Sequence, residues 1–339
     1  EDVIVVTINY RLQALGFLCL PSLGIYGNQT LKDQQLALEW IYENISRFNG
    51  DPHNVCLFGE SAGAACVHHH MLNPKSRRFF KKGILHSNCV LADWMYQKNG
   101  EEKSRRLGKN FGSNGNSDQD CLNALMTAPA EKIYENNLRL ADPAEIRQQL
   151  PFVFKPVFER EHEDAFLTES PVELLKNQKI NMPMMIGMND GDGMTMVNYY
   201  RGKRLSPYND DYVKFMPISL NVDPNSVEAE KLGKEIKEFY FEDRNVSGST
   251  LKYFLDFMND FHFTIPQTMT NEFHARYQPE DKQFIYEFCY DGELNLFKEL
   301  LNMKSLPGAC HFDELLYLFD AKILGTEVAV NSDAWKMRQ

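Results

Sequence analysis

A serine stands between two glycines at positions 59 to 63, in the order Gly-Glu-Ser-Ala-Gly. An apolar run before it predicts a strand, and an alanine-rich stretch after it predicts a helix. So tight a turn strains the serine backbone, and we expect Gly59 and Gly63 to be needed to avoid a clash. The Ser61 hydroxyl would then project as a nucleophile, and the Ala62 N–H could stabilise an anionic oxygen. The alternative is an ordinary turn with serine as the helix N-cap.

A serine hydroxyl is a poor nucleophile without a base, and His311 is the histidine best placed to act as one. It follows a Pro-Gly turn and precedes a helical pattern, so a loop could aim it at a site. The acid that orients it should follow a strand between the two, and both Asp190 and Asp192 in "MNDGDG" meet that condition. An ordinary turn remains an alternative for this loop. Too few carboxylates occur at ligand spacing to favour calcium.

Strand and helix patterns alternate along the chain and must position these residues. Strands are predicted at 2–9, 54–58, 83–87, 184–188 and 283–290, and helices at 29–47, 61–72, within 101–140 and over most of 226–278. The continuous apolar run of the second strand predicts burial on both of its faces. This alternation predicts an α/β fold with a mainly parallel sheet. Because there is no linker or internal repeat, we expect one domain over residues 1–339.

The composition excludes several classes of function. The chain has 339 residues and a net charge of −11, which gives no electrostatic footprint for nucleic acid or anionic lipid. No apolar run reaches the about 18 residues that a membrane-spanning helix requires. The seven cysteines are odd in number and irregularly spaced, which favours a reducing compartment and disfavours a structural zinc site.

Several segments together resemble the type-B carboxylesterases, the cholinesterase-like branch of the α/β-hydrolases. They are "NYRLQALGFL", "GNQTLKDQQLALEWI", "FNGDPHNVCLFGESAGA", "PVELLKNQKINMPMMIGMNDGDG" and "GACHFDELLYLF", in that order. The resemblance covers nearly the whole chain and is greatest to the insect α-esterases. It implies the α/β-hydrolase fold, with a mainly parallel central sheet, helices on both faces, and a serine esterase activity.

Residue by residue, the resemblance implies that Ser61 is the nucleophile, His311 the base and Asp192 the acid, where the family usually has glutamate. It also implies that Glu60 is the acidic neighbour of the nucleophile and that Ser87 is a supporting serine behind the triad. The acyl-pocket positions fall on Trp94, Phe152 and Met196, and a structural ion pair falls on Arg11 and Asp33.

The chain departs from the family pattern in three places. It contains no Gly-Gly pair, although the family uses one for its oxyanion hole, and it stops short of the family's C-terminal helices. We therefore expect a fragment lacking both termini, incomplete at both ends of the fold. Lys109 stands where secreted relatives have a cysteine that pairs with the counterpart of Cys121. This difference favours a cytoplasmic protein, although secretion stays open because a signal peptide would precede the segment given.

The expected activity is hydrolysis of uncharged carboxylic esters, of xenobiotic or lipid type, through an acyl-enzyme on Ser61. The partner is a small-molecule ester, and no cofactor is implied because the triad needs none. Two alternatives remain: a sequestering protein that reacts with esters or organophosphates and turns over slowly, and a non-catalytic binding protein. Because the oxyanion glycines lie outside this chain, we expect the native protein to hydrolyse esters and the fragment to do so poorly.

Overall fold

A parallel four-stranded sheet forms the centre of the computed structural model, which describes residues 3–92, 94–142, 145, 147, 152–320, 324–325 and 327–339. In spatial order the strands are β3 (Cys56–Glu60), β4 (Lys82–His86), β5 (Met184–Asn189) and β6 (Gln283–Phe288). All three strand pairs are parallel, so the carboxyl ends of the strands lie at one edge of the sheet. The predicted α/β class with a parallel sheet is confirmed.

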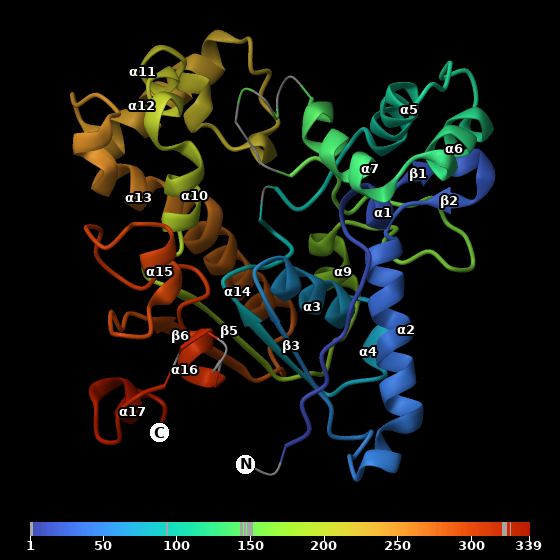
Figure 1. Cartoon of the computed structure of the whole chain (residues 1–339), viewed down its shortest axis with the longest axis horizontal. Helices are drawn as coiled ribbons and strands as arrows, with labels where there is room; N and C mark the ends of the chain where they lie inside the picture. The colour runs from blue at the N-terminus through green and yellow to red at the C-terminus, as the bar shows by residue number, and fades with distance from the viewer. Residues whose placement is uncertain are drawn as a thin grey trace.

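Four helices pack on one face of this sheet, as Figure 1 shows around its centre. They are α2 (Gln29–Asn44), α3 (Ala62–Leu72), α9 (Pro171–Asn177) and α14 (Ile265–Tyr277). Helix α3 follows β3 directly and packs against β3 and β4. Its small residue Ala64, together with Val67 and Met71, joins Leu85 and Ile186 of the strands in one buried cluster. This packing fixes the start of α3 against the sheet.

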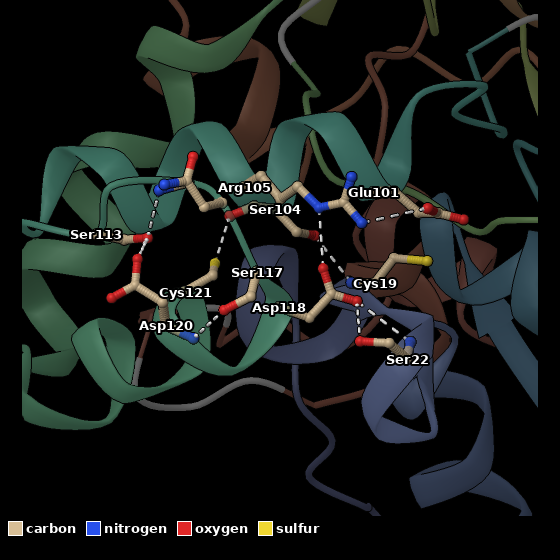
Figure 2. Close-up of polar contacts among 12 residues, drawn as sticks. Cys19, Ser22, Glu101, Ser104, Arg105, Ser113, Ser117, Asp118, Asp120 and Cys121 are labelled. Atoms are coloured by element: carbon tan, nitrogen blue, oxygen red, sulfur yellow. Dashed lines mark hydrogen bonds and ion pairs between the residues drawn. The ribbon is translucent and has the colours of Figure 1, made fainter.

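Two further groups of elements lie on either side of the view in Figure 1, one coloured blue to green and one yellow to orange. The first contains α1 (Gln13–Phe17), β1 (Cys19–Leu20), β2 (Ile25–Tyr26), α5 (Gly100–Asn110), α6 (Asp118–Thr127) and α7 (Ala130–Asn137). Figure 2 shows its polar contacts: Asp118 accepts from Arg105 on α5 at 2.9 Å and from the Ser22 hydroxyl at 2.7 Å. One buried carboxylate therefore joins α5 and α6 to the segment after β1.

The second group has an aromatic core. It contains α10 (Met194–Tyr200), α11 (Pro207–Asp210), α12 (Val227–Phe241), α13 (Leu251–Asn259) and the π-helical turn η8 (Asp260–Thr264). Five rings, Tyr208, Phe215, Phe241, Phe254 and Phe257, contact one another in this core. Helix α10 starts two residues after Asp192, so this core anchors the end of that loop.

Short elements complete the chain. The α-helices are α4 (Pro74–Arg77), α15 (Leu296–Leu300), α16 (Leu315–Leu318) and α17 (Asp333–Met337). The 3₁₀ turns are η1 (Pro21–Leu23), η2 (Ile45–Phe48), η3 (Leu138–Leu140), η4 (Gly202–Arg204), η5 (Tyr212–Phe215), η6 (Ile218–Leu220) and η7 (Gly248–Thr250). The predicted ion pair between Arg11 and Asp33 is present at 2.6 Å.

Two expectations about strands are wrong. Residues 3–9 of the predicted strand 2–9 are not in a strand, and Val3 and Val5 are 71% and 65% exposed. A β-branched sequence forms a strand only where a neighbour accepts its backbone hydrogen bonds, and no strand in the described part of the chain pairs with this segment. Strand β3 lies at the edge of the sheet, because residues 3–9 do not pair with its outer side. It is therefore not buried on both faces, and Cys56 and Phe58 are exposed.

No helix among the described residues has the length and apolar character needed to cross a membrane. All seven cysteines are free thiols. Cys89 and Cys121 are buried, as expected of small apolar residues, but Cys56 is exposed.

Acid is expected to destabilise the fold through the buried histidines of α3. His68, His69 and His70 are all at most 1% exposed. Burial lowers the pKa of His69 and of His70 to about 3. Between about pH 6.5 and 3 the unfolded chain therefore binds protons at these histidines and the folded protein does not. The stability present above about pH 6.5 is lost as the pH falls toward 3.

The expected slope is about 1.4 kcal/mol per pH unit for each such histidine. Urea unfolding between pH 5 and 7.5 should show it, and His69→Gln should reduce the slope by about one proton. The exposed His53 is the matched control, since His53→Gln should leave the slope unchanged. An unchanged slope in His69→Gln would contradict the assignment.

Candidate active site

The turn between β3 and α3 holds Ser61 in a strained conformation, with φ 56° and ψ −122°. Its N–H donates to the carbonyl oxygen of His86 at 2.9 Å, which ties the turn to β4. A Cβ at position 59 would lie 2.3 Å from the carbonyl oxygen of Gly63, so glycine is required at 59. A Cβ at position 63 would meet nothing within 4 Å. The expected steric need for Gly63 is therefore wrong, because the space beside it is open.

The loop that carries His311 is joined to the loop that carries Asp192. Gly191 donates its N–H to the carbonyl oxygen of Ala309 at 2.9 Å, and Asp190 Oδ1 accepts from the Ala309 N–H at 2.7 Å. His311 Nδ1 lies 2.8 Å from Asp192 Oδ1, and both side chains are buried. Of the two candidate acids, Asp192 therefore contacts the imidazole, and Asp190 holds the histidine loop.

Further contacts fix both partners of this pair. Asp192 Oδ2 accepts from the backbone N–H of Asn189 at 3.0 Å, which orients the carboxylate. The imidazole of His311 lies between two rings, with centroid distances of 5.1 Å to Phe263 and 4.5 Å to Phe312. Phe263 comes from the π-helical turn η8, so that irregular turn contributes directly to the position of the histidine.

The other ring nitrogen does not contact the predicted nucleophile. His311 Nε2 lies 3.1 Å from Glu60 Oε1, at an ion-pair distance but without hydrogen-bond alignment. Among the described residues, the Ser61 hydroxyl makes no hydrogen bond. The described residues therefore show no hydrogen bond between His311 and Ser61, and the carboxyl group of Glu60, the residue before Ser61, lies at Nε2 instead.

Carboxylates control the ionisation of this imidazole. Burial alone would lower the pKa of His311, but Glu60 and then Asp192 outweigh it and raise the pKa to about 9. Burial raises the pKa of Glu60 to about 8, against the attraction of His311. The two groups therefore titrate as a coupled pair, in which the carboxylates favour imidazolium and burial favours the neutral acid of Glu60. Only the neutral imidazole can accept a proton from serine.

Glu60→Gln is expected to move the acid limb of kcat/KM to lower pH by about one unit. The reason is that the substitution removes the nearest charge that favours imidazolium, so the base form of His311 persists to lower pH. The measurement is kcat/KM for a p-nitrophenyl ester between pH 5 and 10. Glu242→Gln, at an exposed carboxylate paired with Arg244, should leave the limb in place. A limb that stays fixed or rises in Glu60→Gln would refute the assignment.

The expected oxyanion donor, Ala62, begins the helix after the turn, and the supporting serine, Ser87, follows the neighbouring strand β4. Ala62 is the first residue of α3 and is exposed, so its N–H is free of the helix and open to a ligand. Ser87 follows β4, is fully buried, has φ 58°, and donates its N–H to Gly187 at 2.7 Å. Its hydroxyl has no partner among the described residues.

The three expected pocket residues do not form one group. Trp94 and Phe152 stack with ring centroids 5.1 Å apart, and Trp94 packs with Ala65 in the first turns of α3. Phe152 is 41% exposed, so this pair presents an apolar surface. Met196 instead packs in the aromatic core of α10–α13. The structure thus separates Met196 from the pair.

Sequence reasoning missed Glu314 and the role of Asn189. Asn189 Nδ2 donates to Glu314 Oε2 at 2.5 Å and to the carbonyl oxygen of Cys310 at 2.7 Å. The only sequence signal for Glu314 is its place three residues after His311. Within the described residues, no group of histidine, cysteine and carboxylate side chains is arranged to hold a metal ion.

A model of the carboxylesterase family matches residues 1–339. The chain belongs to the carboxylesterase family. Among curated members, esterase B1 of Culex pipiens is 31% identical over 94% of this chain and 60% of its own length. Esterase FE4 of Myzus persicae is 28% identical over 99% of this chain and 59% of its own length. The chain thus spans about three fifths of the length of these carboxylesterases.

The crystal structure of a juvenile hormone esterase from Manduca sexta, with OTFP covalently attached, supports the fold. It matches 100% of this chain and 63% of its own with a TM-score of 0.83 at 24% identity. The predicted α/β-hydrolase fold is therefore confirmed for this chain.

Proposed function

We propose that this protein is a serine esterase that cleaves carboxylic esters through an acyl-enzyme on Ser61. The observation that carries the proposal is a strained serine turn next to a buried imidazole whose Nδ1 is bound by Asp192. Strain of this kind costs of order 1–3 kcal/mol and persists where the surrounding structure enforces it. A helix N-cap needs no such conformation, and the Ser61 side chain makes no cap hydrogen bond to α3.

The reaction follows from the contacts of each group. In its neutral form, after giving up its Nε2 proton to solvent, His311 exchanges its contact with Glu60 for one with Ser61 and accepts the serine proton on Nε2 as Oγ attacks the carbonyl carbon. Asp192 keeps the proton on Nδ1 and stabilises the imidazolium. The N–H of Ala62 faces the developing oxyanion. The alcohol leaves with the proton from His311, and water, activated by the same imidazole, then releases the acid and regenerates Ser61.

The substrates proposed are uncharged carboxylic esters of xenobiotic or lipid type. The stacked pair of Trp94 and Phe152 supports an apolar acyl group, since it lies beside the first turns of α3. Three acidic side chains lie around His311, those of Glu60, Asp192 and Glu314, and whatever charge they carry is negative, which disfavours an anionic ester. Esters with acyl chains of two to eight carbons would measure the preference.

A fluorophosphonate probe tests the proposal. We expect one equivalent to label the peptide that contains Ser61 and to abolish hydrolysis of p-nitrophenyl butyrate in proportion to labelling. Mass spectrometry of the labelled peptide locates the adduct. Hydrolysis that survives complete labelling, or an adduct elsewhere, would refute the proposal, and the absence of any adduct would favour the non-catalytic binding protein.

One observation favours the slow-turnover alternative as a second candidate. The contact between Glu60 and His311 keeps the imidazole protonated, which slows the base step of deacylation near neutral pH. A burst of p-nitrophenol, followed by a steady rate that increases with pH, would identify a sequestering protein. A linear time course at pH 7 would favour the fast esterase.

A further inference from the structure

A row of four residues crosses the sheet at the level of the candidate site. The strand register pairs Glu60 with His86, His86 with Gly187, and Gly187 with Tyr286. Paired residues of parallel strands present their side chains on the same face. Gly187 has none, and a Cβ there would lie 2.2 Å from two ring carbons of Tyr286. The tyrosine ring therefore occupies the space over β5, and its hydroxyl contacts Nδ1 of His86.

The row continues into the candidate site through Glu314. Its Oε1 lies 3.6 Å from His86 Nδ1, and its Oε2 accepts from Asn189 at 2.5 Å. The backbone N–H of Asn189 in turn donates to Asp192. His86, Glu314 and Asn189 are all buried, so water does not screen these contacts.

We propose that Tyr286 is a positioning residue of the candidate site. Its ring lies over Gly187, and it acts through the ring of His86 on the carboxyl group of Glu314. This inference rests on the proposed function and extends it to a residue on β6. Tyr286 touches no reacting atom. Its hydroxyl donates a hydrogen bond to Nδ1 of His86, and so keeps that nitrogen from accepting a hydrogen bond from Glu314.

The charges around these groups indicate the direction of the effect. Burial lowers the pKa of His86 to about 4 and raises that of Glu314 to about 7, which favours the neutral form of both. Burial and then the nearby acidic side chains raise the pKa of Tyr286. Its hydroxyl therefore stays protonated and acts as a hydrogen-bond donor. The groups facing His311 are Glu60 from β3, Asp192 from the loop after β5, and Glu314 from its own loop.

Without the tyrosine hydroxyl, Nδ1 of His86 is free to accept a hydrogen bond from the protonated carboxyl group of Glu314, 3.6 Å away. This bond places more negative charge on the Glu314 oxygens near His311 and so favours imidazolium. Tyr286→Phe should therefore move the acid limb of kcat/KM to higher pH by roughly half a unit to one unit, with kcat lowered more than KM is raised. Gly187→Ala should do the same because it displaces the ring. Glu314→Gln should move the limb the opposite way.

The matched control is Tyr240→Phe, which removes a partly buried hydroxyl that donates to Asp260 at 2.7 Å on the helical side of the molecule. It should leave the limb unchanged. An unshifted limb in Tyr286→Phe, or shifts of the same sign in Tyr286→Phe and Glu314→Gln, would overturn the proposal. A merely structural role would lower the melting temperature without moving the limb.

Nitrogen-15 spectra of the histidine side chains distinguish failure of this inference from failure of the proposed function. In Tyr286→Phe, the Nδ1 resonance of His86 should shift near pH 6, because its hydrogen-bond donor changes from the phenol to the carboxyl group of Glu314, whether or not the protein turns over esters. A parent protein that hydrolyses no ester but shows this shift would refute the esterase alone. Spectra of His86 that are unchanged in Tyr286→Phe would refute the inference alone.

Discussion

Replacing Ser61 by alanine is expected to lower kcat for ester hydrolysis by about 10⁴- to 10⁶-fold. The substitution removes the oxygen that forms the acyl-enzyme and leaves the buried pair of His311 and Asp192 in place. Residual turnover above the rate in water would come from the Ala62 N–H and from binding of the ester. Active-site titration with a p-nitrophenyl ester, before and after the substitution, measures the loss.

Ser249→Ala provides the matched control, because Ser249 is an exposed serine on η7 and lies outside the site. It should keep full activity. Circular dichroism and thermal unfolding should show that Ser61→Ala folds as the parent does, because alanine keeps the Cβ and therefore the same backbone strain at this position. A variant that retains more than about one per cent of the parent kcat would rule out Ser61 as the nucleophile.

Asp192→Asn is expected to lower kcat by about 10³- to 10⁴-fold with little change in KM. The carboxylate accepts from His311 Nδ1 at 2.8 Å and from the N–H of Asn189 at 3.0 Å. An amide in its place can present an N–H to the imidazole, which favours the tautomer that carries its proton on the nitrogen facing Ser61. That tautomer cannot accept the serine proton. The measurement is kcat and KM over pH 6 to 10.

The neighbouring carboxylate provides a demanding control. Asp190→Asn weakens a hydrogen bond to the N–H of Ala309 and does not touch His311 directly. We expect a loss of activity below tenfold, accompanied by a lower melting temperature. If Asp190→Asn lost as much as Asp192→Asn at equal stability, the acid would be misassigned.

Local sequence signals determined the elements of the sheet and the turn that carries the nucleophile. The strand before Ser61 and the helix predicted over 61–72 both appear in the structure, since backbone strain and helix propensity each act over a few residues. Gly59 is explained by a contact within the same turn. Chain order and loop context also identified His311 and left Asp190 and Asp192 as candidate acids. The family resemblance chose Asp192, which the structure joins to His311.

Contacts between distant segments decided the rest. The strand predicted at 2–9 is wrong because strand formation depends on a neighbouring strand, and the local sequence does not show whether one is present. Met196 and Trp94 looked equivalent as apolar pocket residues, but packing placed them in separate cores. Burial made carboxylates near His311 strong enough to reverse its ordinary preference, and no spacing along the chain reports burial.

The sequence by itself determined which groups can do the chemistry: a serine in a strained turn, a histidine on a loop, and an acid after a strand. Only the tertiary structure decided that Glu60 occupies the free nitrogen of His311 and that Tyr286 crosses Gly187 to reach His86. The physical reason is that residue type and local pattern depend only on residues that are neighbours in the sequence. The field at a buried site is the sum of charges from four strands and their loops, which meet only when the sheet forms.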